Sequence, residues 1–170
     1  MDFGAEVNHY AADCSRTIPV NGHFTRRQRS LYDAVLRVFR KALALMVPGT
    51  LMADFHQAVG ELWEEEHINL GLYSLAEKKT NEGSEPLWKN YFMHGTSHSM
   101  GLDVHDPFDR SQAFKAGMVL SCEPAIYIQD EHVGIRLEND ILITDKGPVD
   151  LMEDIPIEAD EIEELMNSFP

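Results

Sequence analysis

Hydrophobic residues recur at helical spacing through the first half of the chain. In the stretch TRRQRSLYDAVLRVFRKALALMVPG they return every three or four positions, and the Pro-Gly pair ends the pattern. Thr25 and Gln28 fit a capping box at its start. A second apolar face begins after Thr50 and ends near Gly71. The pattern therefore predicts two consecutive amphipathic helices.

Alternating apolar and polar positions predict strands on both sides of these helices. Residues 3–20 alternate and end in the turn sequence RTIPVNG. From Met118 on, the stretches MVLSCEPAIYI, VGIRLEN and DILIT are typical of an antiparallel meander. Residues 74–90 predict a polar connection, either a surface insertion or an active-site rim, and the tail predicts one short acidic helix. The predicted class is α+β, in one piece over residues 1–170.

Charge narrows the choice of partner. The 170 residues include 14 Lys and Arg against 29 Asp and Glu, a formal net charge of −15. This balance disfavours nucleic acid and anionic membranes and favours hard cations. The two cysteines, Cys14 and Cys122, have no CxxC spacing, and the sequence has neither a membrane-length apolar run nor a signal-peptide pattern. We therefore expect a reduced, cytoplasmic setting.

One short stretch, HGTSHSMGLDVHD, concentrates candidate chemistry. It holds His94, His98, Asp103, His105 and Asp106 among glycines and small residues. Such a cluster of imidazoles and carboxylates is typical of a metal site, an acid–base site or a polar loop.

Two pairs of carboxylates bracket turns elsewhere in the chain. If Asp2 faces Asp13 in a hairpin, the turn falls in EVNH; if Glu123 faces Glu138, it falls in QDEH. Acids near turns are usually solvated, but Asp2 and Glu123 lie in hydrophobic strand sequence. Four converging carboxylates would repel one another without a cation. With a histidine beside them, they suit Mn, Co, Fe or Zn better than Ca or Mg.

Four stretches of the chain resemble the catalytic blocks of aminopeptidase P: MDFGAEVNHYAADCSRTIPVNG, HGTSHSMGLDVHD, GMVLSCEPAIYI and GIRLENDILIT. That family belongs to the pita-bread metallopeptidases related to prolidase and methionine aminopeptidase. The blocks run in family order from residue 1 to about residue 145. The resemblance implies a pita-bread fold, an α+β fold with a curved antiparallel sheet flanked by helices.

The resemblance also implies two divalent metal ions, commonly Mn²⁺, with Co, Zn or Fe as alternatives. Matched by position, the ligands are Asp2, Asp13, His98, Glu123 and Glu138. Asp13 and Glu138 would bridge the ions. Because the full ligand set is present, the sequence differs from the creatinase branch, which uses the fold without these metals.

The implied reaction is hydrolysis of the N-terminal Xaa-Pro bond of peptides that carry proline at the second position. Glu123 would take a proton from the attacking water and pass it to the departing proline nitrogen. His105 resembles the family histidine near the scissile bond, and His94 the one lining the pocket. Ala125 stands where the family commonly has glycine, and DPF follows His105 where relatives usually have Val-Gly, so details of the pocket differ.

Neighbouring residues have simpler interpretations. Asp103 and Asp106 are expected to hold local turns, and Cys14 and Cys122 to be small core residues. Arg136 either buttresses Glu138 or is exposed, and Tyr127 is expected mainly to pack in the core. The remaining histidines are expected at the surface: His9, His23, His56, His67 and His132.

Three functions stay open from the sequence. The leading one is an Xaa-Pro aminopeptidase, for which we expect a homo-oligomer. Prolidase, which cleaves only dipeptides, is the nearest enzyme alternative. A binding module or inactive fragment that keeps the ligands is the alternative of another class. Since the blocks begin late relative to the family, we expect residues 1–170 to be the C-terminal portion of a catalytic domain, nearly inactive alone.

Overall fold

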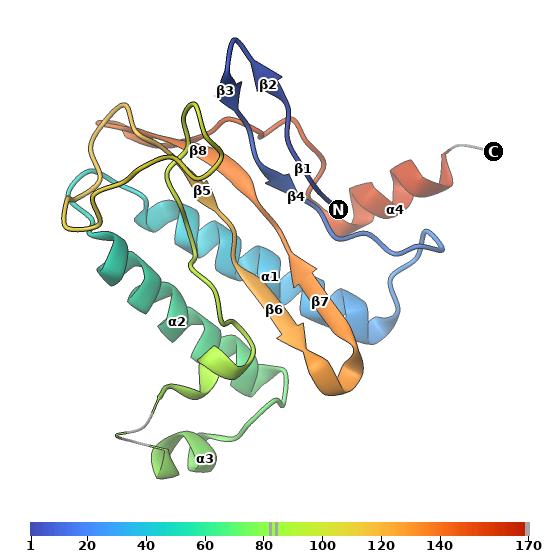
Figure 1. Cartoon of the computed structure of the whole chain (residues 1–170). Helices are drawn as coiled ribbons and strands as arrows, with labels where there is room; N and C mark the ends of the chain where they lie inside the picture. Colours follow the sequence, from blue (N-terminus) through green and yellow to red (C-terminus); the bar gives the residue numbers. More distant parts are fainter. Residues whose placement is uncertain (82, 84, 169–170) are drawn as a thin grey trace.

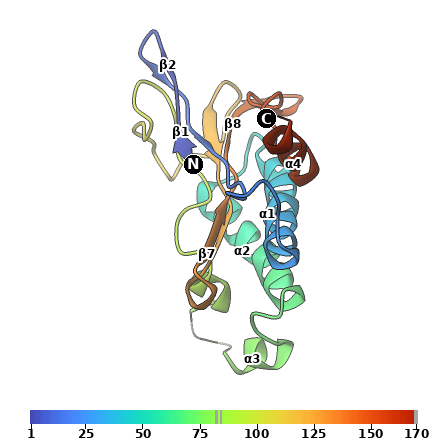
Figure 2. The same ribbon diagram turned by 90° about the vertical axis from the view of Figure 1, so that its right-hand side faces the viewer.

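Helices cover one face of a set of antiparallel strands, and the segment 93–107 crosses the opposite face (Figures 1 and 2). The structure, a computed structural model, describes residues 1–81, 83 and 85–168. Within this part the helices are α1 (Arg26–Leu45), α2 (Met52–Asn69), α3 (Leu75–Thr80) and α4 (Ala159–Asn167), with the short 3-10 helices η1 (Leu87–Asn90) and η2 (Gln129–Glu131).

The strands fall into an N-terminal group and a C-terminal meander. The first group is β1 (Asp2–Phe3), β2 (Glu6–Val7), β3 (Tyr10–Ala11) and β4 (Cys14–Ser15). The meander is β5 (Val119–Cys122), β6 (Ala125–Ile128), β7 (Val133–Arg136), β8 (Asn139–Thr144) and β9 (Gly147–Asp150). β5 pairs with β8, β8 with β9, and β6 with β7, all antiparallel. The predicted antiparallel meander is confirmed.

One long hairpin carries both predicted glutamates. The pairing of β5 with β8 and that of β6 with β7 share one register, so either ladder continued brings Glu123 opposite Glu138. The turn is centred between Asp130 and Glu131, within QDEH, as predicted. Pro124 lacks a backbone N–H and interrupts the ladder beside Glu123, where the two strand pairs meet.

The predicted register of the N-terminal hairpin is wrong by two residues, and the centre of its turn by one. Asp2 pairs with Ser15, not with Asp13. The turn falls on Asn8 and His9, which both have positive φ, 53° and 68°. Two-residue hairpin turns of this kind need two consecutive left-handed residues, and Asn tolerates that conformation well. The position of this residue pair, rather than the spacing of the acids, sets the register.

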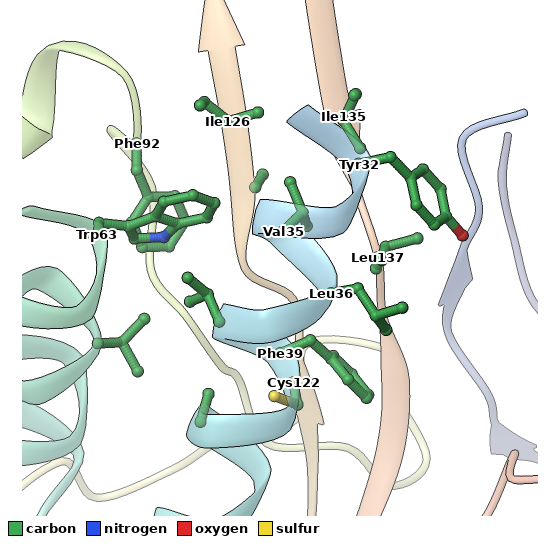
Figure 3. Close-up of a cluster of buried hydrophobic side chains, with 14 of the residues drawn as sticks. Tyr32, Val35, Leu36, Phe39, Trp63, Phe92, Cys122, Ile126, Ile135 and Leu137 are labelled. Atoms are coloured by element: carbon green, nitrogen blue, oxygen red, sulfur yellow. The ribbon is translucent and has the colours of Figure 1, made fainter. Parts of the chain in front are cut away.

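The core lies between α1, α2 and the meander (Figure 3). Side chains from α1 such as Val35 and Phe39 pack against Ile126 of β6 and against Leu137, which lies between β7 and β8, and all four are buried. The capping box predicted at Thr25 is present, since its side chain accepts a hydrogen bond from the Gln28 backbone N–H. This packing supports the strands whose other face carries the candidate chemistry.

The connection predicted over residues 74–90 is partly helical, because Ser74 forms a capping box with Glu77 and starts α3. Residues 82 and 84 lie outside the described part of the chain. Farther along, η1 places the buried Trp88 against Gly60 of α2. To the predicted polar connection the structure adds a short helix and one buried side chain, that of Trp88.

His67 is fully buried, so its predicted surface position is wrong. Its ring stacks on Trp63 with 5.0 Å between centroids and meets Tyr91 edge-on at 5.1 Å. Burial lowers the pKa of His67 from 6.5 to about 3. His56 is also half-buried, with its Nδ1 2.9 Å from the Thr96 hydroxyl. Aromatic packing of α2 against Tyr73, Trp88, Tyr91 and Phe92 accounts for both differences.

A buried arginine fastens the segment after β9 to the strands. Arg16 is 4% exposed, and its guanidinium donates to the carbonyl oxygens of Glu138 and Pro156 and to Oδ1 of Asn139, at 2.7–2.9 Å. None of these acceptors titrates, so the contact does not depend on pH.

In the described residues, no helix combines the length and the apolar character required to cross a bilayer.

Replacing Gly60 by Ala should destabilise the fold. The added Cβ would lie 2.4 Å from the Trp88 ring, and Trp88 is buried, so the ring or η1 must shift. We expect the free energy of unfolding to fall by about 1–3 kcal/mol. Urea denaturation measures this, with Gln57→Ala on the exposed face of α2 as the control. Equal stability of Gly60→Ala and the unchanged chain would contradict this packing.

His67 should make stability depend on acidity. Its pKa in the folded chain, about 3, lies below its ordinary value of 6.5, so at intermediate pH only the unfolded chain binds the proton. This contribution to stability is complete above pH 6.5 and is lost as pH falls toward 3, by up to about 1.4 kcal/mol per pH unit. Urea denaturation at pH 7 and pH 5 should show a smaller loss for His67→Phe than for the unchanged chain. The exposed His23→Phe serves as the control, and equal losses in all three proteins would refute this assignment.

Candidate metal centre

Three carboxylates surround the imidazole of His98. Its Nε2 lies 3.5 Å from Asp13 Oδ2, 3.8 Å from Glu123 Oε1 and 3.8 Å from Glu138 Oε1. Ligand atoms of Asp13, His98 and Glu138 all lie within 4.8 Å of one another. Residues far apart in the sequence therefore supply one compact set of nitrogen and oxygen donors.

Backbone pairing holds His98 over the strands. Its N–H donates to the Ser121 hydroxyl at 3.0 Å, and its carbonyl accepts from the Ser121 N–H at 2.9 Å. The Glu123 N–H donates to the carbonyl of Thr96 at 2.9 Å. The segment before β5 thus runs alongside that strand, and the two ligand candidates, His98 and Glu123, share one anchored frame.

Asp2 lies at the edge of this cluster. Its side chain is 62% exposed, and Oδ2 accepts from Arg136 Nη2 at 2.5 Å. Arg136 Nε lies 3.6 Å from Glu138 Oε2, so the buttressing interpretation of Arg136 is supported by geometry. Hydrogen bonds from Arg136 and from the Ser15 hydroxyl connect the Asp2 carboxylate to the rest of the cluster.

The two predicted substrate histidines lie next to different members of the cluster. His94 Nδ1 is 3.6 Å from Glu123 Oε2, and its Nε2 is 2.9 Å from the Tyr127 hydroxyl. Tyr127 therefore contacts the site as well as the core. His105 is exposed, with its ring centroid 4.3 Å from that of His98. Both histidines are within reach of a molecule bound at the cluster, and their roles stay predictions.

Burial and mutual repulsion perturb the acids. Burial, followed by the Glu138 carboxylate, raises the pKa of Glu123 to about 7. Burial and the carboxylates of Glu138 and Asp2 likewise raise the pKa of Asp13. Burial alone would lower the pKa of His98, but Glu138, the Ser99 carbonyl and Glu123 raise it overall. The site as it stands thus favours protons, or another cation in their place.

Two residues of the site were missed from the sequence. Ser15 is buried and donates to Glu138 Oε2 at 2.6 Å. Asp140 accepts from the Asp13 N–H at 3.2 Å, and burial raises its pKa to about 7. Strand alternation offered a signal for both, since each lies two residues after a predicted ligand, Asp13 or Glu138. The predicted core positions of Cys14 and Cys122 are confirmed, because both are buried.

The donor set fits a divalent metal ion. One imidazole nitrogen and several carboxylate oxygens are ligands for Mn, Fe, Co or Zn. A cation placed among Asp13, His98 and Glu138 would also relieve the repulsion that, in addition to burial, raises the pKa values of Asp13 and Glu123.

Comparison with known proteins agrees with this donor set. The sequence model of metallopeptidase family M24 matches residues 1–145. The chain belongs to metallopeptidase family M24. Its implied cofactors are accordingly divalent metal ions.

Similar proteins of this family are Xaa-Pro aminopeptidases. That of Escherichia coli K12 is 38% identical over 180 residues, which cover 98% of this chain and 40% of the relative. Xaa-Pro aminopeptidase 3 of Homo sapiens is 36% identical over 176 residues, covering 97% of this chain and 34% of the relative. The chain thus spans 40% or less of the length of these two relatives.

Solved structures confirm the predicted pita-bread fold. Proline aminopeptidase P II from Yersinia pestis superposes with a TM-score of 0.86 at 36% identity, covering 99% of this chain and 41% of that one. Zinc-substituted Escherichia coli aminopeptidase P in complex with product gives a TM-score of 0.85 at 36% identity, covering 98% and 40%. The resemblance to aminopeptidase P seen in the sequence blocks is confirmed as well.

Removing the Asp13 carboxylate should abolish stabilisation by metal. At a Mn²⁺ concentration of 100 times Kd, the unchanged chain should gain about 2.7 kcal/mol of stability, seen as a rise in Tm. Asp13→Asn keeps the side-chain shape but removes a charged ligand, so most of the rise should disappear. Asp130→Asn makes the same charge change at the exposed turn and should keep the rise. An undiminished rise in Asp13→Asn would place the metal elsewhere.

Proposed function

We propose that this chain carries the metal centre of an Xaa-Pro aminopeptidase, which hydrolyses the first peptide bond of peptides with proline at the second position. The observation that carries the proposal is the convergence of Asp13, Glu123 and Glu138 on His98. Membership of family M24 and the similarity to Xaa-Pro aminopeptidases support the reaction class.

The proposed metal centre is dinuclear, with five ligands from this chain. Asp13, His98 and Glu138 form the compact group, Glu123 adds a carboxylate 3.8 Å from His98, and Asp2 completes the five. When bound, the metal ions would polarise the scissile carbonyl and lower the pKa of water. The chain's own groups have to bind the peptide, hold its reacting bond in place and move protons.

Glu123 is the proposed proton carrier. It would accept a proton from the attacking water and deliver it to the leaving proline nitrogen. Before a cation binds, burial and then the Glu138 carboxylate raise its pKa to about 7, and a bound cation would lower this pKa again. His94, 3.6 Å from Glu123 and bonded to Tyr127, would contact the peptide on one side. His105, exposed beside His98, would do so on the other.

Further parts of the proposal concern the setting. Mn²⁺ is the proposed native metal, and a homo-oligomer is the proposed assembly. Two free, buried cysteines are in keeping with a reduced compartment, for which we propose the cytoplasm.

The decisive experiment measures Mn²⁺ binding and hydrolysis of Xaa-Pro peptides side by side, for this chain and for a family-length protein that contains it. Cleavage of tripeptides and longer peptides supports an aminopeptidase, whereas cleavage of dipeptides alone supports prolidase. Binding without hydrolysis in both proteins supports the non-catalytic alternative. Since the chain spans 40% of its Escherichia coli relative, we expect most activity in the longer protein.

Glu123→Gln should separate chemistry from metal binding. The amide keeps the size of the side chain but cannot carry the proton, so turnover should fall by about 10²–10⁴-fold in the family-length protein. Steady-state kinetics at saturating Mn²⁺, with metal content measured on the same sample, checks this. The control is Glu131→Gln, at the exposed turn of the same hairpin. Near-normal turnover of Glu123→Gln with metal bound would exclude Glu123 as the proton carrier.

A further inference from the structure

Ser15 stands between two strands that carry predicted ligands. Its backbone pairs with Asp2 on one side and with Glu138 on the other. Residues directly opposite each other in antiparallel strands project to the same face. Ser15 is 2% exposed, so its hydroxyl has to find its partners within this group.

The geometry assigns a direction to the hydroxyl's hydrogen bonds. A serine hydroxyl has one proton to donate and lone pairs that accept. Arg136 Nε donates to Ser15 Oγ at 2.8 Å, because a guanidinium has no acceptor. Ser15 Oγ lies 2.6 Å from Glu138 Oε2 but 3.4 Å from Asp2 Oδ1. The Ser15 hydroxyl therefore donates its hydrogen bond to Glu138. Arg136, Ser15 and Glu138 form a chain of hydrogen bonds in that order.

This chain of hydrogen bonds gives the two carboxylate oxygens of Glu138 different partners. Oε2 is held by Ser15, while Oε1 lies 3.8 Å from His98 Nε2 within the ligand cluster. The Glu138 side chain is only 2% exposed, so water cannot replace a lost partner readily. Without the hydroxyl, the cationic group nearest to Oε2 is Arg136 Nε, at 3.6 Å. Attraction to this cation would then rotate the Glu138 carboxylate away from its present orientation.

We propose that Ser15 is a positioning residue, whose hydroxyl fixes the carboxylate of Glu138 so that Oε1 points at the metal position. The role rests on the proposed metal centre and adds to it a residue that does not bind the metal itself. Removing a hydrogen-bonding partner of a metal ligand typically weakens metal affinity by about 10–100-fold.

The test is isothermal titration calorimetry with Mn²⁺ on the 170-residue chain. Ser15→Ala should weaken Mn²⁺ binding by about 10–100-fold, and Ser15→Thr, which restores the hydroxyl, should bind nearly as the unchanged chain does. Thr17→Val is the matched control. It removes a half-buried hydroxyl whose hydrogen-bond partners in the described part of the chain are the backbone carbonyl and N–H of Arg136, both at 3.2 Å. Its Mn²⁺ affinity should stay unchanged.

The outcomes are distinct. Unchanged affinity in Ser15→Ala, or equal losses in Ser15→Ala and Ser15→Thr, would overturn the role of the hydroxyl while leaving the metal centre in place. Absence of Mn²⁺ binding by the unchanged chain would overturn the metal centre and this role with it. If circular dichroism shows that Ser15→Ala is unfolded, Ser15→Cys replaces it. That variant keeps the size with only a weak donor, and it should show the same loss.

Discussion

Bringing several carboxylates into one poorly hydrated space is the constraint on which the rest of the structure depends. Around His98, the side chains of Asp13, Glu123 and Glu138 are only 16%, 13% and 2% exposed. Burial is the largest cause that raises the pKa values of Asp13 and Glu123, and repulsion between the like charges raises them further. A folded chain tolerates such a group only when other interactions hold the backbone in place, and when protons or a metal ion neutralise the acids.

The strands and their covering helices provide that hold. A single hairpin brings Glu123 and Glu138 together, and its apolar face packs on α1 and α2. The helices lie on one side of the strands and the segment 93–107 on the other (Figure 2), so the apolar core and the polar cluster occupy opposite faces. The backbone of His98 is then held against β5 by Ser121, through one hydrogen bond to its hydroxyl and one from its backbone N–H. The fold, more than the local sequence, brings these acids and the histidine close enough to bind one metal centre together.

The sequence predicted the parts governed by simple repeating patterns. The helix cap at Thr25, the meander and the opposition of Glu123 to Glu138 were all predicted, the last because a clearly polar turn separates two apolar strands. The pairing of Asp2 was not, since the left-handed conformations of two turn residues decide it and composition alone does not locate them. His67 and Ser15 were misjudged or missed for another reason. Tyr91, which packs on His67, and Glu138, which bonds Ser15, come from distant segments. Strand alternation puts Ser15 on the face of Asp13, but only the assembled fold shows these two partners.

The buried guanidinium of Arg16 has a consequence for where the functional unit ends. The family match stops at residue 145, yet Arg16 bonds the carbonyl of Pro156 and, through Glu138 and Asn139, the strand beside the ligands. Residues beyond the match are therefore mechanically part of the site's scaffold. A domain boundary drawn at residue 145 would leave donors of Arg16 unsatisfied directly behind Glu138. The physical unit extends at least to the segment that follows β9, whatever the extent of sequence similarity.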